Sequence, residues 1–252
     1  MRALRRFFLA LVLLSFPLAG TAQASNQNVL AGAGDYSAGA KYGGQTLQLL
    51  QWVNPGTVFT LGDYGYDSPP VNAWHILDSK TKPTRGNHES AGTYTGEYGQ
   101  PLWYSYDVAG AHFVVLDGNS PTNSAQLQWL KADLATSKAK CKVAYWHQPA
   151  YSSGKHPAHG SALWTTAATG GVTLVMNGHE HSYSRFAPRN GVTEIIVGTG
   201  HTKEGWSQSA GGVKNITNTA GVLKLTVHPT SLDFAFIELS HKVGDSGTIA
   251  CR

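Results

Sequence analysis

Five segments of this 252-residue chain end a strand-like run in Asp, Asn or His, and four of them place glycine beside that residue. In chain order they are Gly34-Asp35, Gly62-Asp63-Tyr64-Gly65-Tyr66, Gly86-Asn87-His88-Glu89, His147-Gln148-Pro149 and Gly178-His179-Glu180-His181. Carboxylate, carboxamide, phenolate and imidazole groups suit iron, manganese or zinc in a site without thiolates. Glycine beside a ligand lets backbone and side chain turn sharply toward an ion. Together the segments predict a metal site.

Each segment is weak evidence when taken alone, because a Gly-Asp pair usually forms a turn and a single histidine is usually a surface or core residue. The ordered set is far more specific, and competing catalytic motifs are incomplete. The chain has no Gly-x-Ser-x-Gly nucleophile elbow, and Cys141 stands at the start of a predicted strand. Gly32-Ala33-Gly34 opens like a dinucleotide fingerprint, but Ser37 stands in place of its third glycine.

Alternating apolar runs and amphipathic stretches must position these segments. Strands are expected at residues 28–33, 57–61, 112–116, 142–146, 173–176 and 193–197, and helices at residues 45–53 and 124–137. Strands that are apolar throughout are typical of the buried sheets of α/β proteins. Side chains just past the carboxyl ends of such strands gather in one crevice. After Thr219 the pattern predicts a closing antiparallel hairpin, and no repeat or linker divides the chain.

The ordered segments resemble the calcineurin-like metallophosphoesterases, and within them the purple acid phosphatase type. The resemblance runs from Asp35 to the closing strands. Most of the superfamily begins with Asp-x-His, whereas Ser37 occupies that second position here. Purple acid phosphatases also lack this histidine and use the tyrosine of Gly-Asp-x-x-Tyr, which is Tyr66. The resemblance implies a four-layer α/β/β/α sandwich of two mixed β-sheets, with the metal site at the carboxyl ends of the strands.

The resemblance also implies two sets of metal ligands that share one carboxylate. One metal would be held by Asp35, Asp63, Tyr66 and His181. The other would be held by Asp63, Asn87, His147 and His179. A phenolate ligand favours a hard trivalent ion, so the expected cofactors are Fe(III) with Fe(II), Zn(II) or Mn(II). Two such ions would clamp phosphoryl oxygens and activate a water for in-line attack on phosphorus.

Three further histidines match the family's outer-sphere groups. His88 corresponds to the residue that contacts substrate phosphate or protonates the leaving group. His156, nine residues past the ligand His147, is the better match for a second histidine of this kind, and His159 is the second choice. We therefore expect His88 and His156 to be catalytic and all three to bind substrate. Asp67 and Glu89 are expected either to support the ligands or to be solvated acids.

The amino-terminal residues 1–24 have the form of a signal peptide. Arg2, Arg5 and Arg6 precede an apolar run, and small residues up to Ala24 form a cleavage site. A membrane anchor is the alternative, but the run is short and Pro17 interrupts it. We expect residues 25–252 to form the catalytic domain of a secreted or periplasmic protein, without stable membrane insertion of the mature chain.

The overall charge gives no reason to expect a nucleic-acid duplex as a partner. The formal net charge is +4, and the three arginines of the expected signal peptide supply most of it. The chain has two cysteines, Cys141 and Cys251. In an exported protein a lone pair is expected to form a disulfide, with two buried thiols as the alternative.

The expected function is hydrolysis of small phosphorylated substrates, first of all phosphomonoesters. Phosphodiesters and nucleotides are alternatives for the same site, because the loops that contact a leaving group cannot be placed from the sequence. A protein of another class, catalytically silent and binding phosphate or a glycan, is the rival interpretation. The oligomeric state is left open.

Overall fold

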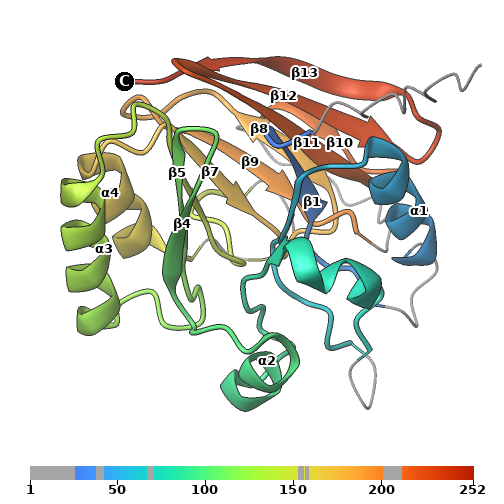
Figure 1. The fold of residues 1–252 in the computed structure, drawn as a ribbon, viewed down its shortest axis with the longest axis horizontal. Helices are drawn as coiled ribbons and strands as arrows, with labels where there is room; N and C mark the ends of the chain where they lie inside the picture. The colour runs from blue at the N-terminus through green and yellow to red at the C-terminus, as the bar shows by residue number, and fades with distance from the viewer. Residues whose placement is uncertain (1–25, 38–42, 67–70, 153–155, 157–158, 201–211) are drawn as a thin grey trace, which may run out of the picture.

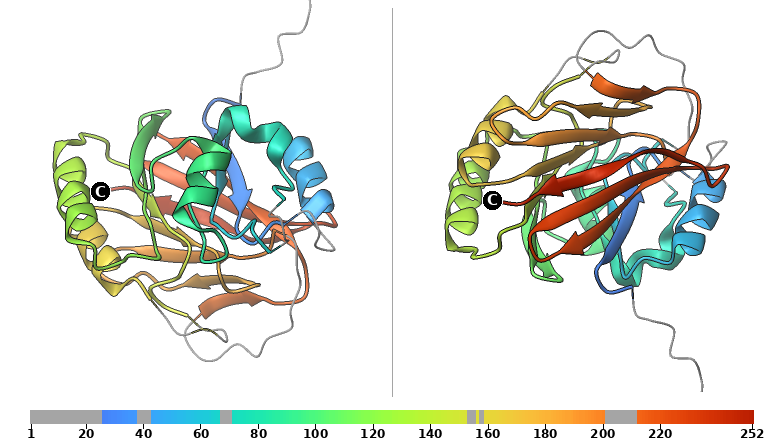
Figure 2. Two further views of the ribbon diagram at one scale, coloured as in Figure 1. Left: turned by 90° about the horizontal axis from the view of Figure 1, so that it is seen from below. Right: turned by 90° about the horizontal axis from the view of Figure 1, so that it is seen from above.

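The computed structural model describes residues 26–37, 43–66, 71–152, 156, 159–200 and 212–252. Two β-sheets pack face to face, and helices lie on their outer sides (Figures 1 and 2). Helices α3 (Ser124–Thr136) and α4 (Ser161–Thr169) lie on one side of the sheets and α1 (Gly43–Val53) on the opposite side. The predicted α/β/β/α sandwich is confirmed.

One sheet has six strands within the described residues. Their order is β13 (Val243–Ala250), β12 (Ser231–Glu238), β11 (Gly221–His228), β1 (Val29–Ala33), β2 (Thr57–Thr60) and β3 (Thr81–Lys82). Strands β1, β2 and β3 are parallel, whereas β11 is antiparallel to β1. Strands β11 and β12 form the predicted antiparallel hairpin.

The other sheet has seven strands in the described part of the chain. Their order is β10 (Gly212–Ile216), β8 (Tyr183–Phe186), β9 (Thr193–Val197), β7 (Leu174–Asn177), β6 (Lys142–Tyr145), β5 (Ala111–Val115) and β4 (Tyr104–Val108). Strands β5, β6, β7 and β9 are parallel, and the others are antiparallel to their neighbours. Both sheets are therefore mixed, as predicted.

Alternate residues of the strands build two apolar layers. Between the sheets, Tyr183 of β8 stacks on Phe236 of β12 with ring centroids 4.4 Å apart. On the outer face of the seven-stranded sheet, Leu130 and Leu134 of α3 pack in one cluster with Val175 of β7. Each buried leucine stabilises the fold by roughly 1.5 to 3 kcal/mol relative to an exposed one. This packing fixes the loops at the strand ends.

The predicted elements are present, with ends displaced by at most two residues. One expectation was wrong: the segment Gly86-Asn87-His88-Glu89 does not directly follow a strand, because β3 ends at Lys82 and residues 83–85 lie between them. Proline cannot donate a ladder hydrogen bond. The sequence did not predict the helices α2 (Ala91–Tyr98) and α4, the short 3₁₀ helix η1 (His75–Lys80), or the strands β3, β4, β8, β10 and β13.

A disulfide joins Cys141, which precedes β6, to Cys251, which follows β13. The neighbouring Arg252 donates hydrogen bonds from its guanidinium to the carbonyl oxygens of Asn190 and Val172, both at 3.0 Å. The carboxyl-terminal end is thus held against the seven-stranded sheet. No helix of the described residues is long and apolar enough to cross a membrane. The expected signal peptide, residues 1–24, lies outside the described residues.

Candidate metal centre

The predicted donor residues follow the carboxyl ends of strands in both sheets. Asp35 follows β1 and Asp63 follows β2, whereas His147 follows β6 and His179 follows β7. Hydrogen bonds join the two sheets at this point. His147 donates from Nδ1 to the carbonyl oxygen of Leu61 at 2.6 Å, and the backbone N–H of His179 donates to Asp35 Oδ2 at 2.9 Å. The structure therefore brings these expected donor residues together between the two sheets.

Three donor residues adopt a backbone conformation that side chains other than glycine seldom take. The φ angles are 61° at Asp35, 60° at Asp63 and 71° at His179. Such conformations cost roughly 1 to 3 kcal/mol each and persist at functional sites where surrounding contacts fix them. Gly86 allows the close approach, because a Cβ there would lie 1.9 Å from Asp63 Oδ1. The sharp turns thus occur at three of the expected metal ligands.

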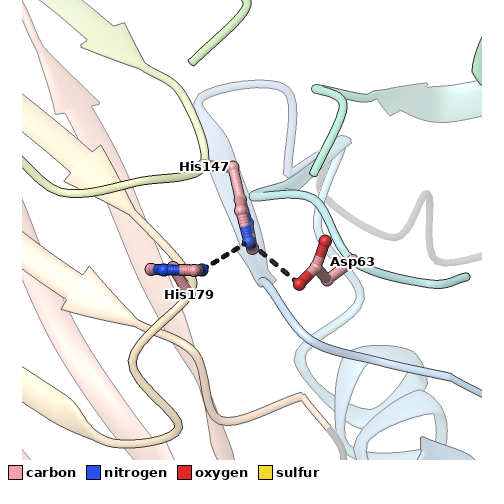
Figure 3. Close-up of side chains that lie close together, drawn as sticks. All are labelled: Asp63, His147 and His179. Atoms are coloured by element: carbon pink, nitrogen blue, oxygen red, sulfur yellow. Dashed lines mark hydrogen bonds and ion pairs between the residues drawn. The ribbon is translucent and has the colours of Figure 1, made fainter. Parts of the chain in front are cut away.

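Asp63, His147 and His179 form one compact donor group (Figure 3). Asp63 Oδ2 lies 3.0 Å from His147 Nε2, and that nitrogen lies 3.2 Å from His179 Nδ1. One ligand atom from each residue lies within 4.8 Å of the other two. Asn87, the fourth expected ligand, follows Gly86 and lines the same surface hollow as His179. The arrangement fits one metal ion.

A second donor group surrounds the hydroxyl of Tyr66. This oxygen lies 2.6 Å from Asp35 Oδ1, 3.1 Å from Asp63 Oδ2 and 2.9 Å from His181 Nε2. His181 Nε2 also lies 3.2 Å from Asp35 Oδ1. A phenol has a single proton to donate, so it cannot satisfy both carboxylates at once. A cation at this point would satisfy all four residues, and Asp63 belongs to both groups.

The electrostatics of the buried groups also favour bound cations. Burial raises the pKa of Asp35, but its hydrogen bond to His181 and the charge of that residue lower the pKa further, to below its usual range. Burial and the adjacent carboxylates raise the pKa of Tyr66 far above its usual value. The buried carboxylates of Asp35 and Asp63 lie side by side, and buried negative charges require positive charge nearby. Metal ions would supply that charge.

The histidines of the first group differ in charge. Burial lowers the pKa of His147, but the carboxylate of Asp63 outweighs burial and raises the pKa to about 9. Burial and the charge of His147 lower the pKa of His179 to about 4. A metal ion binds neutral imidazole, so His147 would release its proton on binding.

Glu89 supports the loops that carry the donors. Its buried carboxylate accepts hydrogen bonds from the backbone N–H groups of Gly65 at 2.6 Å, Gly86 at 2.8 Å and Asp63 at 3.2 Å. It therefore links the loop of Asp63 to the loop of Asn87. The sequence left open whether Glu89 is solvated, and the structure shows a buried supporting residue. Asp67, for which the sequence left the same two alternatives open, lies outside the described residues.

Sequence reasoning missed two supporting carboxylates. Asp117 is buried and accepts hydrogen bonds from the guanidinium of Arg85 at 2.8 to 3.2 Å, which holds the loop before Asn87. Asp117 follows the apolar run of β5, so the strand-end pattern that marked the other segments could have found it. Glu180 is the second, a buried residue between His179 and His181 whose contacts are described below.

His88 lies at the rim of the centre and is exposed over 43% of its side chain. Its Nε2 lies 3.9 Å from Asp63 Oδ2, and its ring centroid lies 4.2 Å from that of Tyr66. The backbone N–H of His88 donates to Asp63 Oδ1 at 2.9 Å. An imidazole in this position can reach both the centre and solvent.

The structure brings His156 and His159 to the same region by different contacts. The ring centroid of His156 lies 4.5 Å from that of His179. His159 is exposed and lines the hollow that Asn87 and His179 also line. The backbone N–H of His159 donates to the carbonyl oxygen of Pro149 at 2.7 Å. Both histidines are therefore near the first donor group.

The comparisons with known sequences agree with this geometry. The family model of the calcineurin-like phosphoesterases matches residues 25–183. Purple acid phosphatase 22 of Arabidopsis thaliana is 35% identical over 200 residues, covering 60% of this chain and 46% of that protein. Purple acid phosphatase 21 of the same plant is 32% identical over 179 residues, covering 64% of this chain and 40% of that protein. The chain thus spans less than half the length of these relatives.

Solved structures share the fold at low sequence identity. A purple acid phosphatase from yellow lupin seeds has a TM-score of 0.73 and 19% identity, covering 88% of this chain and 53% of that one. GAP50, the anchor in the inner membrane complex of Plasmodium, has a TM-score of 0.72 and 17% identity, covering 89% of each chain. One of these proteins is named a phosphatase and the other an anchor, so the fold alone does not decide function.

Proposed function

The chain belongs to the calcineurin-like phosphoesterase family, and from this membership we propose that it is a metal-dependent phosphatase that hydrolyses phosphomonoesters at a dinuclear centre. The observation that carries the proposal is the position of Asp63 Oδ2, which lies 3.0 Å from His147 Nε2 and 3.1 Å from the Tyr66 hydroxyl. One carboxylate thus belongs to two donor groups, as a bridging ligand must.

The two donor groups divide the ligands as the family pattern implies. Asp35, Asp63, Tyr66 and His181 would hold one ion. Asp63, Asn87, His147 and His179 would hold the other. When bound, the two ions would clamp the phosphoryl oxygens and activate a water nucleophile. Tyr66 would supply a phenolate, which favours Fe(III), with Fe(II), Zn(II) or Mn(II) as its partner ion.

The residues around the ions would bind the substrate and move a proton. His88 is exposed to solvent and within 3.9 Å of Asp63, so its Nε2 can hold a proton beside the leaving-group oxygen. His156 would contact the phosphate from the side of His179, with His159 further along the hollow. The buried carboxylates and Glu89 hold this geometry before substrate arrives.

We further propose that the protein is exported, with residues 1–24 as its signal peptide. The disulfide between Cys141 and Cys251 supports an oxidising compartment, because such bonds are rare where glutathione keeps thiols reduced. The protein would then be secreted or periplasmic.

A catalytically silent protein that binds phosphate or a glycan is the rival function, and the same fold occurs in GAP50, which is named an anchor. Loss of catalysis usually removes some metal ligands. All seven expected ligand positions are filled here, counting Tyr66 for the missing histidine. The presence of all seven ligand residues supports the enzymatic function over the rival.

The decisive experiment is metal analysis together with turnover on a panel of phosphoesters. Wild-type protein should bind two ions and hydrolyse phosphomonoesters. His88→Ala should retain both ions and lose roughly 10²- to 10⁴-fold in kcat, with a larger loss on alkyl than on aryl esters, because a poor leaving group needs a proton. His228→Ala is a matched control, since His228 is exposed to 41% and ion-paired to an aspartate outside the centre. If metal-replete wild-type protein hydrolyses no phosphoester, the proposed enzymatic function is wrong.

A further inference from the structure

A small hollow adjoins the proposed metal centre, and we propose that it binds the alcohol part of the substrate and selects small polyhydroxy alcohols such as glycerol or a sugar. This inference rests on the proposed phosphatase function and names its substrate class. The hollow has a volume of about 280 Å³ and is lined by Asn87, Gly118, Asn119, Pro121, Gln148, His159 and His179. Pockets for drug-sized ligands are usually larger, at roughly 300 to 1,000 Å³.

The position of the hollow relates it to the reacting bond. Two of its lining residues, Asn87 and His179, are proposed ligands of one metal ion. A phosphate bound at the ions would therefore lie at one end of the hollow. The alcohol of the ester would extend from that phosphate, and the hollow is a space beside the ligands that can receive it.

Two carboxamides form a fixed hydrogen-bonded wall of the hollow. Asn119 donates from Nδ2 to the carbonyl oxygen of Gly86 at 2.7 Å, and its Oδ1 accepts from Gln148 Nε2 at 2.7 Å. Each amide nitrogen carries two protons, and each uses one of them in these bonds. Each amide group therefore keeps one further N–H to donate, and the bond to Gly86 ties Asn119 to the loop that carries Asn87.

Gln148 has a buried acceptor oxygen. The residue is only 7% exposed, and its Oε1 is enclosed without a hydrogen-bond partner among the described residues. This oxygen lies against Gly118, where a Cβ would come within 2.3 Å of it. A buried acceptor without a partner costs roughly 1 to 3 kcal/mol. Because this oxygen is enclosed, a ligand in the hollow would meet Gln148 through its amide nitrogen, which carries a second proton beside the one bonded to Asn119.

The chemistry of the wall distinguishes among alcohols. Hydroxyl groups both donate and accept, which matches carboxamide N–H and C=O groups beside the imidazole of His159. Among the described lining residues there is no Lys or Arg for a second phosphate and no Phe, Tyr or Trp for a nucleobase to stack on. The hydrogen-bonding groups of this wall therefore match a small alcohol with several hydroxyls.

The test compares two esters of equal carbon number, glycerol phosphate and propyl phosphate, with the metal-loaded enzyme. Wild-type protein should show a kcat/KM for glycerol phosphate about 10-fold to 100-fold above that for propyl phosphate, as expected for one or two hydrogen bonds. Asn119→Leu and Gln148→Met keep the side-chain size and should each lower this ratio about 10-fold. Gln128→Met, an exposed carboxamide change on α3, should leave the ratio unchanged.

A binding measurement keeps the inference testable if a variant fails to fold. In wild-type protein, glycerol phosphate should shift the side-chain amide resonances of Asn119 and Gln148, whereas inorganic phosphate should not. Equal kcat/KM for the two esters, or unshifted resonances at saturating glycerol phosphate, would refute the proposal that the hollow binds the alcohol. Neither result would contradict the proposed phosphatase function. If metal-loaded protein hydrolyses neither these two esters nor aryl phosphates, the proposed phosphatase function is wrong. The amide resonances would then be the only test of whether the hollow binds the alcohol.

Discussion

The carboxylate of Glu180 accepts a hydrogen bond from the backbone N–H of His156, with Oε1 and nitrogen 2.8 Å apart. The same oxygen accepts from the hydroxyl of Ser152 at 2.8 Å. Glu180 is buried and lies between the proposed ligands His179 and His181. It therefore ties the segment carrying His156 to the loop carrying two metal ligands.

We predict that Glu180→Ala raises KM for phosphomonoesters by about 10-fold and lowers kcat less, because His156 loses its anchor beside the site. Metal content should stay at the wild-type value, since no ligand is removed. Glu180→Gln keeps a carboxamide oxygen as acceptor and should recover most of the loss. Ser152→Ala should produce a smaller effect in the same direction. Loss of metal in Glu180→Ala, or no recovery in Glu180→Gln, would contradict a positioning role.

Asp63→Ala should remove metal and activity together, because both donor groups lose the shared carboxylate. Elemental analysis of wild-type protein should give about two ions per chain, as in other dinuclear sites. Asp233→Ala is a control that removes an exposed aspartate from β12 and should change neither quantity. Wild-type protein that holds one ion or none after metal loading would rule out the dinuclear centre.

Tyr66→Phe should test the proposed iron ligand. If Fe(III) occupies the group around Tyr66, the wild-type protein should have a broad visible charge-transfer band, and the substitution should abolish it because the phenolate is gone. The band is read by absorption spectroscopy on protein of known metal content. A colourless enzyme with two ions and full activity would overturn the iron assignment alone.

The sequence predicted the central strands of both sheets, and marked the polar residues that follow them, because both depend on local patterns. Strand β1 is apolar and ends directly before Gly34-Asp35, so the pattern carries both the element and the residue at its end. Helix α2 was missed because it is short, contains two glycines and buries only Tyr94, so it has no apolar face that the sequence shows. Its start depends on the Ser90 side chain accepting from Thr93 N–H at 3.0 Å.

The contacts that support the donors could not be predicted in the same way. Glu180 and Ser152 are 28 residues apart, and Arg85 and Asp117 are 32 residues apart. Each pair forms only when different strands lie side by side. A charged residue in a sequence shows no sign of whether the fold will bury it, and Glu89 was left open for that reason.

Breaking the disulfide should destabilise the protein without changing its activity. Cys141 and Cys251 are 110 residues apart, so the bond closes a long loop, and its loss should cost about 2 to 4 kcal/mol of unfolding free energy. Cys141 lies at the opposite end of β6 from His147, so metal content and kcat of the double serine variant should match wild type well below its unfolding temperature. Peptide mapping under non-reducing conditions should find the Cys141–Cys251 pair, and free thiols would contradict it.

Glu194 should make stability depend on pH near neutrality. This carboxyl is buried on β9, and although it accepts hydrogen bonds from the backbone N–H groups of Tyr151 and Ala150, burial raises its pKa to about 8. Between the ordinary pKa of 4.5 and about 8 the folded protein keeps a proton that the unfolded chain releases. The free energy of unfolding contributed by Glu194 is therefore present in full below pH 4.5 and falls as the pH rises through this window.

Glu194→Gln removes the titrating group and keeps an oxygen to accept those hydrogen bonds. We expect the variant and wild type to unfold at similar denaturant concentrations at pH 5. At pH 8 the variant should be more stable by about 2 to 4 kcal/mol, because wild type then bears the cost of a buried charge. Denaturant unfolding at both pH values measures the difference. If the difference in free energy of unfolding between variant and wild type does not grow with pH, Glu194 is already ionised in the folded protein at pH 5.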